Sequence, residues 1–318
     1  MNPAFSVLFF TTLSGAGYGL LSWAALASMT GGIPARALLV ALLLGMLLCG
    51  AGLLASFWHL GKPLRAWRAF SQWRTSWLSR EGVLAVASFV PAVLLAAAML
   101  PALLDGSANG GMPALNAAGH AIAIALVACA LATVYCTAMI YASLKPIPSW
   151  RHRLVVPVYV GFALLTGGLL LATIAARSDA APGGPAVLPL AALAVALWLA
   201  KRRYWRDIDA TPLPHTRADA IGLPSRTASV FERPHTEANY ITREMAFVVA
   251  RTHSRWLRRF AVAAFALLPI LCLLPAWWFV HLDATPWFAL AAASSIAGAF
   301  VERWLFFAEA RHMVTLYY

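Results

Sequence analysis

The sequence predicts an all-α, polytopic membrane protein with eight transmembrane helices, arranged as two four-helix bundles within one integral domain, 1–318. Composition is the first reason: 61% of the residues are hydrophobic and only 11% are charged, whereas soluble domains carry about 25% charged residues. The second reason is length, because about 20 apolar residues suffice to cross the hydrocarbon of a bilayer. The apolar runs are continuous rather than alternating, which favours helices over the strands of a membrane barrel.

The eight apolar runs follow one another along the chain, and the sixth is the shortest. No basic segment precedes the first run, so we expect an uncleaved helix rather than a signal peptide. Three connections are short and rich in Gly and Pro, which indicates turns at 30–36, 105–113 and 178–185. The expected spans are 6–29, 36–58, 82–104, 117–142, 153–177, 185–201, 259–281 and 285–308.

One connection, 202–258, is long and basic. Its first half is polar and interrupted by Pro, which indicates a loop. In its second half, 237–260, the apolar residues Tyr240, Val248 and Val249 share one face of a helix. This pattern predicts a helix that lies at the membrane interface and leads into the seventh span. A plain extension of that span, with no functional role, explains the same pattern.

Positive charge is concentrated on one side of the predicted membrane. The net charge is +12, and of the 24 Lys and Arg residues only Arg36 and Arg177 fall on the other side. Cytoplasmic loops carry the excess of Lys and Arg in membrane proteins. We therefore expect both chain ends in the cytoplasm and the protein in a bacterial inner membrane. Because topology explains the charge, we expect the lipid bilayer, and no nucleic acid, as a partner.

The Cys and His residues predict neither a metal site nor a haem in this chain. None of the four Cys forms the C-x-x-C pair that is typical of zinc and iron–sulfur sites. They lie inside apolar runs and are interpreted as core residues: Cys49, Cys129, Cys136 and Cys272. A haem between helices needs His well inside two spans, but the eight His lie at span ends or outside the spans. We expect no haem and no iron–sulfur cluster here.

Two acidic residues lie inside predicted spans, both toward the basic side. Glu81 begins the third span, and Glu302 is near the end of the eighth. Ionisable side chains in a membrane are costly and often functional. Two structural explanations stay open, namely that Glu81 stabilises the first turn of its helix after Ser79, and that Glu302 pairs with an Arg of the same side. Glu302, Glu309 and His312 are also spaced to lie along one helical stripe.

The segment 57–83 brings aromatic, basic and titratable residues to that same edge. Its four Trp suit the headgroup level of a bilayer, and its Lys and Arg suit lipid phosphates or an acidic partner. An interfacial anchor explains these residues but not a His at one inner corner, His59, and a carboxylate at the other, Glu81. An imidazole and a carboxylate beside an apolar cleft suit a redox lipid that carries two protons, such as quinol.

From this arrangement we expect a role for each residue. Glu81 accepts a proton, His59 hydrogen-bonds a quinol oxygen, and Arg65 or Arg80 orients the headgroup.

Several segments together resemble one known family, the membrane anchor subunits of dimethyl sulfoxide reductase (DmsC), and more loosely the polysulfide reductase and NrfD-like anchors. The most specific block is HLGKPLRAWRAF…SWLSREG, at 59–70 and 76–82. Three further segments resemble the family in the same order: IYASLKPIPSW at 140–150, the basic segment at 234–261 and ERWLFFAEARHM at 302–313. The resemblance spans nearly the whole chain.

The resemblance implies a membrane anchor without haem in a molybdopterin oxidoreductase of anaerobic respiratory electron transport. Its partners would be an iron–sulfur electron-transfer subunit and a molybdopterin catalytic subunit. The anchor would oxidise menaquinol or ubiquinol and pass the electrons to the iron–sulfur subunit. In the family, the His of the first block and the Glu that opens the next helix contribute to the quinol site, and they match His59 and Glu81. The terminal block matches at Glu302, Arg303 and His312.

Two other function classes stay open. A secondary transporter or permease places polar groups and broken helices near the bilayer midplane in repeated halves. Here the midplane is apolar and the halves do not match, although Pro91 and Pro157 interrupt predicted spans. A structural anchor without a redox role is the second alternative, because His59 and Glu81 would then only stabilise the fold.

Overall fold

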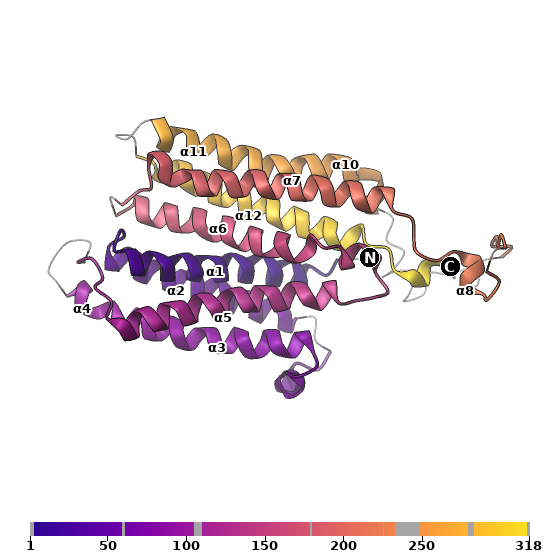
Figure 1. Cartoon of the computed structure of the whole chain (residues 1–318), viewed down its shortest axis with the longest axis horizontal. Helices are drawn as coiled ribbons and strands as arrows, with labels where there is room; N and C mark the ends of the chain where they lie inside the picture. Colours follow the sequence, from indigo (N-terminus) through magenta and orange to yellow (C-terminus); the bar gives the residue numbers. More distant parts are fainter. Residues whose placement is uncertain are drawn as a thin grey trace.

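The protein is an all-α, multi-pass membrane protein (Figure 1). The structure, a computed structural model, describes residues 3–58, 61–104, 110–178, 180–224, 226–232, 249–278 and 283–316. These residues contain no strand, and eight of their helical segments are long and apolar enough to cross a membrane. The segments are α1 (Phe5–Thr30), α2 (Ala35–Phe57), α3 (Trp77–Ala98), α5 (Ala117–Ala142), α6 (Val155–Ala176), α7 (Leu188–Ala210), α10 (Val249–Val262) with α11 (Leu268–Trp278), and α12 (Thr285–Ala308).

Short elements lie at the ends of these helices. A single π-helical turn, η4 (Ala263–Leu267), joins α10 to α11 within the seventh span. The others are η1 (Pro63–Gln72), α4 (Leu100–Leu103), η2 (Pro148–Arg151), η3 (Gly184–Val187), α8 (Arg217–Ala220) and η5 (Met313–Leu316). Local sequence sets several helix boundaries: the Asn116 side chain caps α5 by accepting from the Gly119 amide, and α1 ends at Gly31 with φ 69°.

Two hydrophobic cores hold the helices together. One core joins α1, α2, α3 and α5, and the other joins α10, α11 and η4, while α6, α7 and α12 contribute buried residues to both. Figure 1 shows α6 and α12 between the first group and α10 with α11. The predicted division into two four-helix bundles stays a prediction, because three helices are shared.

Glycine allows the central helices to approach closely. A Cβ atom on Gly19 of α1 would lie 1.7 Å from the Ala163 carbonyl oxygen of α6, and one on Gly167 of α6 would lie 2.2 Å from the Gly19 carbonyl carbon. No other residue type fits at either position. Small residues serve this purpose in membrane helices because lipid tails provide no hydrophobic drive between apolar helices.

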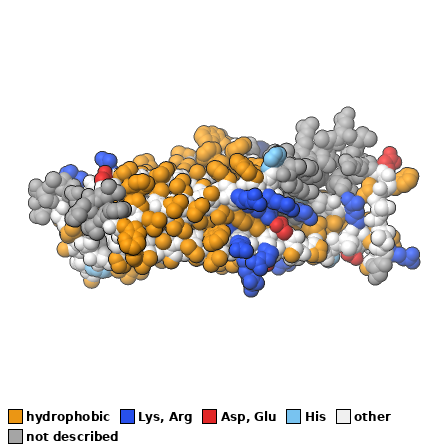
Figure 2. Space-filling view, turned by 90° about the horizontal axis from the view of Figure 1, so that it is seen from above, with side chains coloured by type: hydrophobic (Ala, Val, Ile, Leu, Met, Phe, Trp, Pro, Cys, Tyr) orange, Lys and Arg blue, Asp and Glu red, His pale blue; other side chains and the backbone are white. Residues whose placement is uncertain are grey.

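The two ends of the molecule differ in charge. The end that carries η1, η2, α8 and η5, where both termini lie in Figure 1, holds nearly all the described Lys and Arg and is called the basic end here. Figure 2 shows a band of hydrophobic side chains around the helices and a group of Lys and Arg where that band gives way toward the basic end. Large apolar side chains such as Leu47, Leu54 and Val90 are exposed on the transmembrane helices.

Several boundaries differ from the sequence prediction, among them the start of the third span, which is Trp77 and not 82. The sequence predicts that the sixth span ends at 201, but α7 continues to Ala210. The cationic residues after 200 therefore belong to a helix, not to a loop. The seventh span begins at His253, not at 259. Most of the predicted interfacial helix at 237–260 lies outside the described residues, and its described part, α10, runs directly into the span.

Candidate functional site

Glu81 points into the protein and not into lipid. Its side chain is buried, with 3% of the residue exposed, and it accepts a hydrogen bond from the Thr137 hydroxyl of α5. The first-turn explanation of Glu81 is wrong. α3 begins at Trp77, so Glu81 lies in the second turn, and the partner of its carboxylate is on another helix. A buried carboxyl with one described hydrogen-bond donor is costly to keep ionised and is suited to exchanging a proton.

The exposed 3₁₀ helix η1 packs over the start of α3. The Ser79 hydroxyl donates to the Ala69 carbonyl of η1, and a Cβ atom on Gly82 would lie 3.1 Å from the Phe70 ring. η1 therefore covers the first two turns of α3, and so the surface nearest Glu81.

The two candidate arginines lie on different elements, Arg65 on η1 and Arg80 on α3. Arg65 is exposed on η1. The Arg80 guanidinium donates to the carbonyl oxygens of Trp73 and Arg74 and lies 4.3 Å from the Trp77 ring centroid. The described hydrogen-bond partners of Arg80 therefore lie between η1 and α3, and they do not include Glu81. His59 lies outside the described residues, so its pairing with Glu81 stays a prediction.

A second buried group of charges joins α7 to α12. Lys201 Nζ lies 2.6 Å from Glu302 Oε1, and Arg303 Nη1 lies 3.1 Å from Glu302 Oε2. The exposed fraction is 3% or less for each of these residues. The prediction that Glu302 pairs with an Arg is confirmed, although its shorter contact is to Lys201. Sequence reasoning missed Lys201 because the predicted sixth span ends at that residue, although Tyr204 and Trp205 follow it at helical spacing.

Aromatic rings surround the cations of this triad, which consists of Lys201, Glu302 and Arg303. Lys201 Nζ lies 4.0 Å from the Tyr204 ring centroid, and Arg303 Cζ lies 3.4 Å from that of Tyr159 on α6. Cation–π attraction is stronger at buried sites than at exposed ones. The rings therefore help to stabilise two cations beside a single carboxylate.

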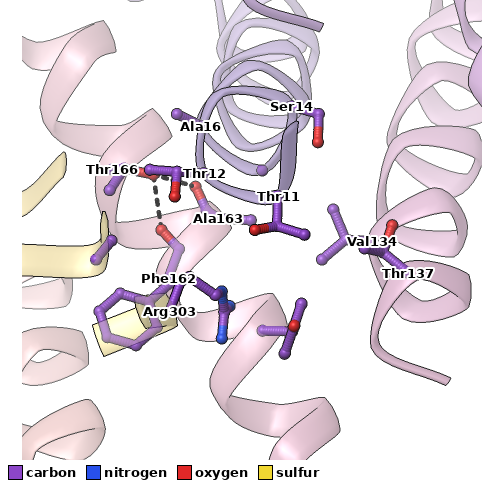
Figure 3. Close-up of a pocket in the computed structure, with 13 residues that line it drawn as sticks. Thr11, Thr12, Ser14, Ala16, Val134, Thr137, Phe162, Ala163, Thr166 and Arg303 are labelled. Atoms are coloured by element: carbon purple, nitrogen blue, oxygen red, sulfur yellow. Dashed lines mark hydrogen bonds between the residues drawn. The ribbon is translucent and has the colours of Figure 1, made fainter. Parts of the chain in front are cut away.

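A small polar cavity separates the triad from Glu81. It has a volume of about 20 Å³ and lies between α1, α5, α6 and α12. Figure 3 shows Thr11 of α1 between Thr137 on one side and Thr166 and Arg303 on the other. Thr137, which donates to Glu81, and Arg303, which binds Glu302, therefore line the same cavity.

The predicted stripe of Glu302, Glu309 and His312 is wrong, because α12 ends at Ala308. Glu309 follows the helix and binds Arg258 of α10 at 2.9 Å, and burial raises the pKa of the Glu309 carboxyl. His312 accepts a hydrogen bond from the Val314 amide, and burial lowers its pKa.

A cleft opens beside Glu309 at the basic end. Its volume is about 310 Å³, and its polar lining includes Ser149, His152, Asp207, Asp209, Arg258 and Glu309. Within it, His152 Nε2 lies 3.1 Å from Asp207 Oδ2, and Arg258 binds both carboxylate oxygens of Asp209. The cleft places ionisable groups between the buried triad and the end of the molecule.

The core interpretation of the cysteines fits the structure. Cys49, Cys136 and Cys272 are buried and Cys129 is half-buried, and none forms a disulfide. Among the residues that the structure describes, no group of His, Cys, Asp and Glu is arranged to hold a metal ion.

Comparison with known proteins gives a consistent result. The family model of the DMSO reductase anchor subunit (DmsC) matches residues 1–308. A subunit of the sulfite dehydrogenase of Allochromatium vinosum is 36% identical over 343 aligned positions, which cover 100% of this chain and 99% of that protein.

Proposed function

Because the chain belongs to the family of DMSO reductase anchor subunits, it is a multi-pass anchor of an oxidoreductase of that type, and we propose that it oxidises quinol. Its partners in this proposal are a molybdopterin catalytic subunit and an iron–sulfur subunit that receives the electrons. The basic end would face the cytoplasm of a bacterium and dock these partners. The catalytic subunit, and not the anchor, would bind the terminal substrate.

The observation that carries the proposal is the buried carboxyl of Glu81 near the start of α3, where η1 packs. Oxidation of one quinol releases two electrons and two protons. The Glu81 carboxylate takes these protons one after the other, becomes a carboxylic acid each time and releases the first proton before it accepts the second, while His59 hydrogen-bonds a quinol oxygen. The electrons leave one at a time to the iron–sulfur subunit. Arg65 of η1 and Arg80 of α3 would orient the headgroup.

Glu302 and His312 are also predicted to contact quinol, but their surroundings favour this role less than those of Glu81. Glu302 is occupied by two cations, and His312 lies beyond the end of α12. Their contact with quinol stays a prediction, and the geometry favours Glu81.

The opposite direction of electron flow is a second candidate function. The relative from Allochromatium vinosum is a sulfite dehydrogenase subunit, and a dehydrogenase withdraws electrons from its substrate. If this chain serves such an enzyme, the electrons reach the site from the partner and reduce quinone to quinol. Glu81 then gives its proton to the quinone oxygen instead of receiving one.

The test is the Glu81→Gln variant in the assembled complex. We expect quinol oxidation to fall by about 10²- to 10⁴-fold, because the amide cannot accept the proton. Steady-state turnover with a soluble quinol measures this effect, and turnover with sulfite and quinone measures the reverse direction. Normal rates in both assays would contradict the proposal.

Two controls isolate the effect on the site. Glu232→Gln makes the same chemical change at an exposed position and should leave the rate unchanged. The molybdenum and iron content of each preparation, together with activity toward an artificial electron donor, shows whether the partner subunits are bound and intact.

A further inference from the structure

The buried polar groups form one continuous series across the bundle, from α3 to α7. Glu81 contacts Thr137, and Thr137 lines the small cavity. Arg303 lines the same cavity and binds Glu302, which binds Lys201. Ionisable residues so deep in a membrane protein are costly, and a bundle of apolar helices needs no such series merely to hold together.

The small cavity is suited to hold water. A water molecule needs about 10–15 Å³ of space and two to four polar partners, and the cavity offers about 20 Å³. Two buried hydroxyl groups on its wall, Tyr159 Oη and Thr12 Oγ1, have no hydrogen-bond partner in the described part of the chain. Water in the cavity would satisfy both of them and would contact Thr137 and Arg303.

A second, smaller cavity continues the series beyond the first. Its volume is about 10 Å³, and Tyr159 and Arg303 line it as well as the first cavity. Lys201, Glu302 and Tyr204 complete its polar lining. The Tyr204 hydroxyl donates to the carbonyl of Ser149, at 3.3 Å, and Ser149 lines the cleft that holds Glu309. The carbonyl itself cannot pass on a proton, so the last step, from the Tyr204 hydroxyl to the cleft, would use a water molecule of the cleft.

We propose that this series is a proton route that connects Glu81, through water in the small cavity, to the Glu302 triad and the cleft around Glu309. The inference rests on the proposed function, which makes Glu81 a proton-exchanging group. The Glu81 acid gives its proton through the Thr137 hydroxyl to the cavity water, and a proton passes on toward Glu302. The carboxylate of Glu81 is thereby regenerated, and the electrons leave separately to the partner subunit.

The cover formed by η1 explains why such a route is needed. Glu81 is only 3% exposed, and η1 packs over the start of its helix. The described hydrogen bond of its carboxylate points inward to α5. A proton held at Glu81 therefore has a hydrogen-bonded continuation toward the interior of the bundle.

The test compares Tyr159→Phe with Tyr135→Phe in the assembled complex. The first change removes the unpartnered hydroxyl but keeps the ring against Arg303, and the second changes a Tyr of α5 that is 43% exposed. We expect Tyr159→Phe to slow quinol turnover by about 10- to 100-fold, to raise the solvent isotope effect in heavy water, and to leave the affinity for quinol unchanged. Tyr135→Phe should match the wild type.

A second pair of variants guards against a folding defect. Thr12→Val removes the other unpartnered hydroxyl, whereas Thr133→Val removes a buried hydroxyl whose described hydrogen bond is to the Cys129 carbonyl. Thr12→Val should repeat the slow, isotope-sensitive turnover, and Thr133→Val should not.

The outcomes separate the route from the proposed function. If Glu81→Gln is slow while Tyr159→Phe and Thr12→Val turn over normally, the route is wrong and the proton role of Glu81 stands. Slow turnover of these two variants with an unchanged isotope effect also overturns the route, because it shows a structural role. If Glu81→Gln is normal, both the proposed function and the route fail.

Discussion

At the scale of single residues, several ionisable side chains are buried within the membrane-spanning helices. Each of them has a partner of opposite charge, a hydroxyl or an aromatic ring. Lys201, with 2% exposure, is the extreme case, since Glu302 binds it at 2.6 Å and two rings flank it. Removing one member of such a group leaves a charge that water cannot reach.

We therefore expect Lys201→Met to destabilise the protein by roughly 3–5 kcal/mol, the typical cost of breaking a buried ion pair. Thermal unfolding of the purified protein in detergent measures the effect. Arg202→Met, at the exposed neighbouring position, is the matched control and should unfold near the wild-type temperature. Equal unfolding temperatures for the two variants would show that the triad does not stabilise the fold.

The residues of the site can be predicted only in part from the sequence. Glu81 is conspicuous, because it is one acid at the start of an apolar run. Lys201 is not, because a cation at the end of an apolar run is also what a span boundary looks like. Thr137 carries no sequence signal, since its role comes from contact with a residue 56 positions away.

At the scale of the elements, α1 is positioned by glycine contacts with its neighbours. The eight spans and their order follow from apolar runs and turn residues. The ends of α5 and α12 follow too, at Ala142 and Ala308, but that of α7 does not, because α7 continues through cationic residues to Ala210. A helix that leaves the membrane stays helical while its polar residues find partners, and hydropathy alone does not register those partners.

The contact between α1 and α6 gives a prediction at this scale. We expect Gly19→Ala to destabilise the bundle by about 1–3 kcal/mol or more, because the new methyl group would overlap the Ala163 carbonyl and force the helices apart. Gly50→Ala is the control, since a Cβ atom there meets nothing within 4 Å. Folded yield and unfolding temperature measure both. If Gly19→Ala behaves like Gly50→Ala, α1 and α6 do not pack this closely.

At the scale of the whole molecule, the polar groups of the candidate site lie toward the basic end. In Figure 1, α3 begins and α12 ends at that end, and with them Glu81 and Glu302, so the proposed partners would dock on the same side as the site. The charge distribution can be predicted from the sequence. The sequence does not predict the series of buried polar groups, because that series depends on how six helices pack.

Topology reporters test the orientation. We expect a fluorescent protein fused after Tyr318 to fluoresce, and alkaline phosphatase fused after Ser178 to be active, because positive charge stays in the cytoplasm. Phosphatase fused at the C-terminus is the control and should be inactive. The reverse pattern would place the basic end, and with it the proposed docking side, outside the cytoplasm.

The central claim is that Glu81 changes its protonation when quinol is oxidised. Infrared difference spectroscopy of the assembled complex measures this directly, because a carboxylic acid has a C=O stretching band that a carboxylate lacks. We expect quinol oxidation to produce such a band transiently, before the carboxylate is regenerated, in time-resolved spectra of the wild type, and no corresponding band in Glu81→Gln. An identical carboxylic acid band in both proteins would contradict the claim.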